Sequence, residues 1–403
     1  MTGAHTVGAR TVGAHSVGAH SVETHTIEVE GARVTLDLGV GHIADLAFEV
    51  RDGGAGRRTL RPLHRAPWVG ERADEGADLA PDLPPDLAPV ERRLSGDFLC
   101  APFGPPGDAD TPPHGYPANS SWTLVDERSE GGVASATFRL DREVRGARVE
   151  KELRLVEGHP ALYQTHRLTG GSGTITAAHH PMVRMEAGGR LDVSPKRFAL
   201  TPHVRHWPEP KARLAYPGRA GALDGFPGAQ GGTVDLADYA PGERGEDFAV
   251  LVEAPGSALG WSVVTRHAEG DLVVILKDPS VLPVTMLWRS NGGRDAAPWS
   301  GRHLGVWGIE DGRSDALTGT APGDPLPEAG VPTGFDLAPG RTHTIGHVIA
   351  ALPRPAGWSG AREAAPGDGG LRLSGDGAGA LVPLDPGFPL APRKAARGSH
   401  PAA

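Results

Sequence analysis

The sequence has a single cysteine, few aromatic residues and no long hydrophobic run. Cys100 is the one cysteine among 403 residues, which excludes an internal disulfide and a CxxC metal motif. No apolar stretch approaches the roughly eighteen residues that span a bilayer, so no membrane partner is expected. The first residues lack the charged start and apolar core of a secretory signal. We therefore expect a cytoplasmic protein in which Cys100 is a small buried residue.

Dense basic patches and nucleotide-binding motifs are also missing. The formal net charge is −9, which argues against nucleic acid as a partner. No glycine-rich phosphate motif follows a strand, and no segment shows apolar residues at helical spacing for three turns. Nucleotide-binding folds with alternating strands and helices are therefore excluded.

What the sequence does contain favours strands and turns. Gly 58 and Pro 38 make up about a quarter of the chain, and the hydrophobic content of 38% is enough for a core. Residues 33–38 and 147–155 alternate polar and apolar side chains, as half-buried strands do. Short apolar runs at 248–252, 261–264 and 272–276 are typical of strands covered on both faces. The pattern predicts an all-β fold, a large two-sheet β-sandwich.

The composition divides the chain into three parts. Residues 1–24 form a pentad repeat that begins GAHTV, GARTV, GAHSV; five matches neither the strand nor the helix period, so we expect a disordered leader. Its histidines, His5, His15 and His20, offer at most a loose metal tract. Residues 25–352 form the predicted sandwich domain. Residues 353–403, rich in Pro, Gly and Ala, are expected to be a largely disordered tail.

Three segments carry the candidate chemistry. Residues 113–122 read PHGYPANSSW and place His114 in a loop that can aim its imidazole into a cleft. Residues 174–181 read TITAAHHP and end a strand pattern at His180, while residues 304–311 read LGVWGIED and end an apolar run at Glu310. Partial burial beside Trp307 would raise the pKa of Glu310 toward that of a useful base.

In their order along the chain, these segments resemble the galactose mutarotase-like, or aldose 1-epimerase, superfamily. The resemblance implies the sandwich of that superfamily, a small sugar as substrate, and no cofactor. It further implies that His114 orients the substrate, His180 is the general acid and Glu310 the general base. The alternatives are that His114 caps a turn, His180 bonds a carbonyl at a strand end, and Glu310 is a solvated turn acid.

Other positions of the family pattern are matched less well. Arg93 and Arg184 are the candidates for its substrate-binding arginine, and Asp224 is the candidate for its middle aspartate. Asp311 stands where the family has a proline after the base. Trp288, followed by polar residues, is the candidate for an aromatic surface on which a sugar face packs.

Two other function classes remain open. A non-catalytic carbohydrate-binding protein would keep the aromatic surface and His114 without needing Glu310. A metal-dependent β-barrel of the cupin type would gather His179 and His180 with His203 and His206, although their spacing is no tight metal signature, and we expect no metal. We expect a monomer or homodimer.

Overall fold

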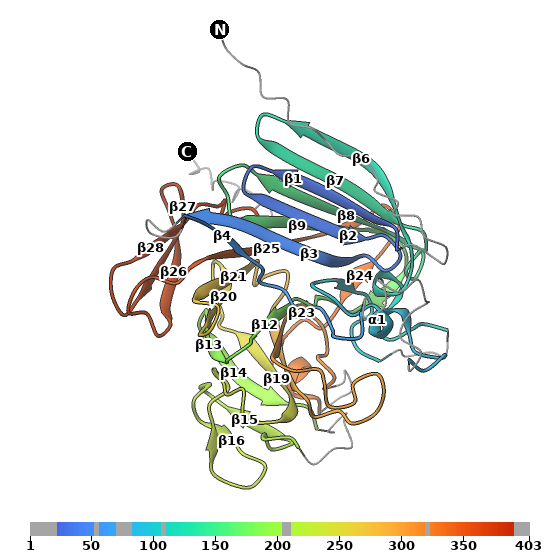
Figure 1. The fold of residues 1–403 in the computed structure, drawn as a ribbon. Helices are drawn as coiled ribbons and strands as arrows, with labels where there is room; N and C mark the ends of the chain where they lie inside the picture. Colours follow the sequence, from blue (N-terminus) through green and yellow to red (C-terminus); the bar gives the residue numbers. More distant parts are fainter. Residues whose placement is uncertain are drawn as a thin grey trace, which may run out of the picture.

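The computed structural model describes residues 22–51, 56–69, 83–105, 110–203, 211–318 and 323–390. About 51% of the chain is strand and 3% is helix, in several antiparallel sheets, so the all-β prediction is confirmed (Figure 1). Nearly all of the expected leader at 1–24 lies outside the described residues. The first strand, β1 (Thr24–Val29), begins at the last residue of the expected leader, one residue before the expected sandwich domain.

Three larger sheets build the domain. The four-stranded sheet has the order β1, β2 (Ala32–Asp37), β3 (His42–Arg51), β4 (Arg57–Leu60). The nine-stranded sheet has the order β18 (Asp238–Tyr239), β13 (Gly189–Val193), β20 (Gly260–Arg266), β21 (Asp271–Lys277), β25 (Thr342–Pro353), β9 (Ala161–Gly170), β8 (Ala147–Val156), β7 (Val133–Leu140), β6 (Trp122–Glu130). The eight-stranded sheet has the order β15 (Gly218–Ala220), β14 (Lys196–Thr201), β19 (Gly245–Glu253), β22 (Val284–Asn291), β23 (Val306–Arg313), β11 (Ala177–His179), β5 (Leu99–Cys100), with β12 (Met182–Arg184) also paired to β23.

Smaller elements complete the described chain. The short sheets are β10 (Gly173–Ile175) with β24 (Phe335–Leu337), β16 (Phe226–Pro227) with β17 (Thr233–Val234), and β26 (Ala361–Gly367), β27 (Gly370–Gly375), β28 (Ala380–Val382). The helices are α1 (Pro89–Arg92), α2 (Pro325–Glu328) and the 3-10 turn η1 (Tyr116–Ala118). Among the described residues, no helix is long and apolar enough to span a membrane.

The strands follow the sequence patterns. In β2, Ala32, Val34 and Leu36 are buried, whereas Arg33 is exposed and Thr35 is half-buried, which is the period of two expected for a strand with one wet face. The apolar runs at 248–252, 261–264 and 272–276 lie in β19, β20 and β21, where every residue is buried. Strands covered on both faces need no alternation, and these three show none.

One core joins the three larger sheets. The inner face of the nine-stranded sheet contributes Leu153 and Ile275, the four-stranded sheet contributes Phe48, and the eight-stranded sheet contributes Leu251 and Ile309. Figure 1 shows β1–β3 lying across β7–β9, with β19 and β23 below. The two-sheet sandwich is thereby extended by a third sheet at one end.

The C-terminal tail differs from the expectation of disorder. Residues 361–382 form the three-stranded sheet β26–β28, which lies at the side of the domain (Figure 1). Leu371 and Leu373 of β27, together with Trp358, pack on the outer face of the nine-stranded sheet against Val274 and Val348. The physical reason is the alternation at 371–373, which buries two leucines about Arg372. The Gly and Pro residues here supply turns. Residues 391–403 lie outside the described chain.

Candidate active site

His114 lies in a tightly tied loop between β5 and η1. Its φ of 62° is left-handed, a value that few residues other than glycine adopt. Its N–H donates to the Gly104 carbonyl over 2.8 Å, and its own carbonyl accepts from the Ala101 N–H over 3.2 Å. A side chain at Gly115 would collide with the Ala101 carbonyl, so this position requires glycine. The loop thus holds the imidazole in place, with Nδ1 3.3 Å from Cys100 Sγ.

His180 directly follows β11 and precedes Pro181. Its N–H donates to Asp97 Oδ1 over 2.9 Å. The Phe98 ring stacks on its imidazole with centroids 4.6 Å apart. A side chain held at its backbone and on one ring face has little freedom left, so His180 presents its Nε2 in a fixed direction.

That direction leads to Glu310 on β23. The distance from His180 Nε2 to Glu310 Oε1 is 3.2 Å, and the two residues are only 4% and 2% exposed. Gly308 lies two residues earlier on the same face; a Cβ there would come within 2.6 Å of Glu310 Oε1, so the glycine leaves room for the carboxyl group. The burial of Glu310 rules out a solvated turn acid.

The structure therefore brings four sequence-predicted residues together. The ring centroids of His114 and His180 are 5.3 Å apart at an angle of 87°. The Trp288 ring, on β22 next to β23, lies 5.6 Å from that of His180. Two loops and two neighbouring strands thus place His114, His180, Glu310 and Trp288 on one face of the eight-stranded sheet.

Burial shifts the proton affinities of these groups in opposite directions. It raises the pKa of Glu310 well above its usual range, against a smaller lowering by Arg294. Burial also lowers the pKa of His180 well below its usual range, and that of His114 to about 4. A carboxylate with a raised pKa is a stronger base, and an imidazolium with a lowered pKa is a stronger acid. Both shifts favour proton transfer to and from a bound molecule.

Sequence reasoning missed Arg294. Its guanidinium carbon lies 4.1 Å from the Trp299 ring centroid and 5.1 Å from that of Trp288. Its charge lowers the pKa values of both Glu310 and His114, so it is the cation of this site. Arg294 belongs to the loop between β22 and β23, three residues after Asn291. The sequence signal was the clustering of Trp, Asn and Arg in that loop.

A wall of aromatic side chains adjoins the site. The indole N–H of Trp288 donates to Glu246 Oε2 over 2.8 Å, and Ser290 Oγ donates to Glu246 Oε1 over 2.7 Å. Trp299 packs edge-on against Trp288 with centroids 5.9 Å apart. The His303 ring stacks on the Trp288 ring, with centroids 5.4 Å apart. Aromatic faces flanked by carboxylate and guanidinium groups suit a sugar, which has both apolar faces and hydroxyl groups.

The two arginines expected at the site lie elsewhere. Arg93 ends α1 and forms an ion pair with Asp37 Oδ2 at 2.6 Å, so it ties α1 to the four-stranded sheet. Arg184, on β12, is 48% exposed and pairs with Glu186. Closeness in sequence to His180 was misleading because β12 ends at Arg184, where the chain reaches the surface beyond the buried Met182 and Val183.

Asp224 is also not brought to the site. It is exposed in the turn between β15 and β16. In the eight-stranded sheet, β15 stands at the end opposite to β11 and β5. The width of the sheet therefore separates Asp224 from His180.

The cupin-type histidine cluster is not assembled either. His179 and His180 are consecutive in extended chain and therefore point to opposite faces: His180 meets Glu310, whereas His179 stacks on His347 inside the sandwich with centroids 4.0 Å apart. His203 is exposed beyond the end of β14. His206 lies outside the described residues.

A cavity of about 840 Å³ lies beside the site. Its wall includes His64, whose ring is 4.8 Å from that of His303. Its charged lining is mostly basic and comprises Arg61, Arg65, Arg184, Arg244 and Arg302 with Asp45 and Glu186. His114, His180 and Glu310 do not line it.

Solved structures of other proteins share this architecture, although no sequence match is found. No family model and no curated protein matches the sequence. Among solved structures, a candidate mutarotase from Salmonella typhimurium superposes with a TM-score of 0.53 at 11% identity, over 82% of this chain and 91% of that one. A candidate aldose 1-epimerase from Escherichia coli K12 gives 0.52 at 14%, over 82% and 98%. One from Klebsiella pneumoniae gives 0.52 at 16%, over 82% and 80%.

The chain has the galactose mutarotase-like fold. The three motifs that suggested this superfamily thus point to the correct architecture, although so few residues are shared. Identity this low establishes the fold alone. The function of this mutarotase-like domain has to be argued from His114, His180 and Glu310 themselves.

Proposed function

We propose that the protein is an aldose 1-epimerase-like isomerase that interconverts the anomers of a pyranose or a sugar derivative. The observation that supports this most is the 3.2 Å approach of His180 Nε2 to Glu310 Oε1. The hydroxyl and ring oxygens that exchange protons in this reaction are bonded to the same carbon. An acid and a base that serve them must therefore be neighbours, as these two side chains are.

The reaction needs no redox step. Burial favours the form of the pair in which Glu310 holds the proton and His180 is neutral. Transfer of that proton across the 3.2 Å contact gives the carboxylate and the imidazolium. In this form Glu310 takes the proton of the anomeric hydroxyl while His180 gives a proton to the ring oxygen. The bond between the anomeric carbon and the ring oxygen breaks, and the hydroxyl becomes the aldehyde. After rotation about the neighbouring carbon–carbon bond, the ring oxygen attacks the other face of the carbonyl. His180 then takes back the proton that it gave, and Glu310 returns its proton to the new hydroxyl.

The remaining site residues orient the sugar. His114 is neutral at neutral pH because burial lowers its pKa to about 4, so it acts as a hydrogen-bonding group. Trp288 offers a ring to an apolar sugar face. Arg294 offers the planar donors that hydroxyl oxygens accept from. The partner is accordingly a small sugar; a cytoplasmic location and a monomer or homodimer belong to the same proposal.

Anomer-exchange NMR tests this proposal directly. The purified protein is mixed with free and phosphorylated aldoses, and the exchange rate between the two anomeric signals is measured for each sugar. We expect acceleration for at least one aldose over the rate without protein. A protein that binds a sugar, by titration of its ring protons, yet accelerates no exchange would instead support the carbohydrate-binding alternative.

A further inference from the structure

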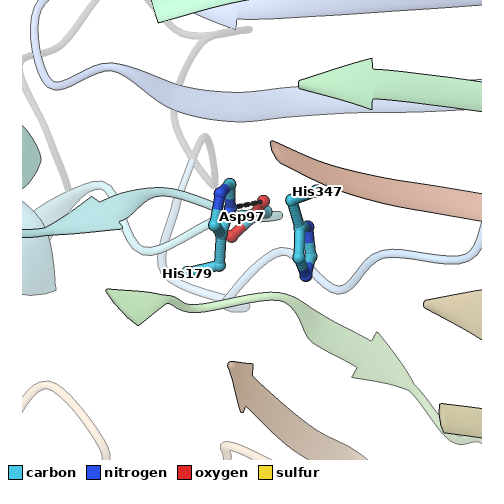
Figure 2. Close-up of side chains that lie close together, drawn as sticks. All are labelled: Asp97, His179 and His347. Atoms are coloured by element: carbon cyan, nitrogen blue, oxygen red, sulfur yellow. Dashed lines mark hydrogen bonds and ion pairs between the residues drawn. The ribbon is translucent and has the colours of Figure 1, made fainter. Parts of the chain in front are cut away.

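Directly behind the candidate active site, three buried side chains form a second cluster inside the sandwich. Asp97 precedes β5, His179 ends β11, and His347 comes from β25 of the opposite sheet. All three have no exposed surface. One donor atom from each lies within 4.8 Å of the others. Figure 2 shows His179 and His347 side by side with the Asp97 carboxylate between their upper edges.

Hydrogen bonds define which nitrogen atoms carry protons. Asp311 is a carboxylate partner of the buried Lys277, whose Nζ lies 2.9 Å from its Oδ1. Its Oδ2 therefore accepts, and His347 Nε2, 3.2 Å away, must donate. In the neutral imidazole, Nδ1 of His347 then carries the lone pair. A histidine whose second nitrogen donates to a carboxylate is the usual arrangement behind a metal ligand.

Several ring nitrogens inside the cluster, donors and acceptors alike, are unpaired within the described part of the chain. His347 Nδ1, His179 Nε2 and both nitrogens of His166 are buried with no hydrogen-bond partner among the described residues. The His166 ring lies edge-on to His179 with centroids 4.7 Å apart. A buried polar atom without a partner costs about 1–3 kcal/mol. Several such atoms in one cluster indicate that a further species completes it.

We propose that Asp97, His179 and His347 bind a divalent first-row transition-metal ion of the zinc type. The donors are imidazole nitrogens and one carboxylate with no thiolate, a set that suits zinc and its neighbours. His166 stands close enough in the same cluster to supply a further imidazole after a side-chain rotation. His179 Nδ1 lies 3.0 Å from Asp97 Oδ2, so Nε2 of His179 is the nitrogen left to ligate.

The ion would be structural. Asp97 uses Oδ1 to accept the N–H of His180 and Oδ2 to accept from His179 and Gln164. An ion held by Asp97 would therefore fix the strand end that carries His180, on the face turned away from Glu310. It would join the two sheets, since His347 belongs to the nine-stranded sheet and His179 to the eight-stranded one.

The test measures bound metal on the full-length protein. Protein freed of metal by a chelator is equilibrated with Zn²⁺, gel-filtered and analysed for zinc per chain. The leader histidines could bind zinc loosely, so a variant with His5, His15 and His20 replaced by Gln is measured in parallel. We expect wild type and this leader variant to retain about one ion per chain, and His347→Gln to retain none.

A matched control and a second readout keep the result interpretable. His303→Gln alters another buried histidine, in the loop between β22 and β23 beside Trp288, and should retain the ion. If His347→Gln does not fold, Co²⁺ bound to the leader variant should show an X-ray absorption shell of at least two imidazoles. The proposal is overturned if wild type retains no ion, if the leader variant loses it, if a folded His347→Gln keeps it, or if the cobalt shell lacks imidazole.

Discussion

Glu310 and Asp311 are neighbours on β23 and equally buried, but their pKa values are shifted in opposite directions. Glu310 faces the candidate active site, meets His180, and has its pKa raised well above the usual range by burial. Asp311 faces the interior, where Lys277 Nζ lies 2.9 Å from its Oδ1 and holds its pKa low despite the same burial. Nearby charged groups, rather than the extent of burial, therefore decide whether a buried acid is ionised.

The same division between the two faces is found at the end of β11, where His179 and His180 are consecutive. His180 points outward to Glu310, while His179 points inward to Asp97 and His347. On the outer face, burial raises the pKa of Glu310 and lowers that of His180, and both shifts favour proton transfer. On the inner face, the charged side chains have partners: Asp311 pairs with Lys277, and Asp97 accepts from His179. One pair of strands thus carries chemistry on one side and cross-sheet connections on the other.

The largest expected effect is that of Glu310→Gln on anomer exchange. The amide keeps the shape of the carboxyl group but cannot take a proton, and loss of a general base typically slows a reaction about a hundredfold to ten-thousandfold. Sugar affinity should stay within a few fold, because little binding contact is lost. Exchange NMR and a sugar titration on the same sample measure both quantities. Full activity in this variant would remove Glu310 from the mechanism.

Asp311→Asn should instead lower stability. The change leaves Lys277 buried with one carboxylate partner fewer, and breaking a buried ion pair costs about 3 kcal/mol. Glu310→Gln replaces an acid that burial tends to keep protonated with a neutral amide, so its free energy of unfolding should change by less than about 1 kcal/mol. Urea unfolding of both variants makes the comparison. Equal losses would contradict the proposed difference between the two faces.

His114→Asn should mainly weaken substrate binding. His114 touches the His180 ring at its edge but does not contact Glu310 in any described hydrogen bond or ion pair. We therefore expect KM to rise about tenfold with a smaller fall in kcat, as for a residue that orients the substrate. Kinetics over a range of sugar concentrations separate the two parameters. A fall confined to kcat would make His114 a proton-transfer group instead.

The smallest effect is expected from Trp288→Phe. Phenylalanine keeps an aromatic face for the sugar but removes the N–H that donates to Glu246. Since Ser290 still donates to Glu246, the loss should be about 1 kcal/mol, a few-fold rise in KM. Trp261→Phe, on the outer face of the nine-stranded sheet, is a matched control and should leave KM unchanged. A similar rise in both would point to a general loss of packing.

Local patterns in the sequence were sufficient for the strands and for three site residues. Alternation around Val34 and Leu36 and the unbroken apolar run at 272–276 each reflect one strand and its neighbours, so periodicity predicted them. His114, His180 and Glu310 stood in short motifs whose order matched a known fold. The C-terminal sheet had a local signal too, in Leu371 and Leu373, which the abundance of Gly and Pro obscured.

The remaining features depend on contacts between distant segments. Arg294 reaches the site only because the loop between β22 and β23 folds back over Trp288 and Trp299. His347 meets His179 only because two sheets stack. Arg93, expected to bind the substrate, instead forms an ion pair with Asp37. Long-range packing of this kind has no periodicity or motif from which to predict it.

The central claim is that two outward side chains, His180 next to β11 and Glu310 on β23, carry the chemistry, whereas the inward His179 and Asp311 carry the fold. The most direct test is the anomer-exchange rate per folded molecule of Glu310→Gln and Asp311→Asn, with the folded fraction taken from urea unfolding. We expect that Glu310→Gln loses nearly all exchange while fully folded, and that Asp311→Asn keeps the wild-type rate per folded molecule. The opposite order, or equal loss in both variants, would contradict it.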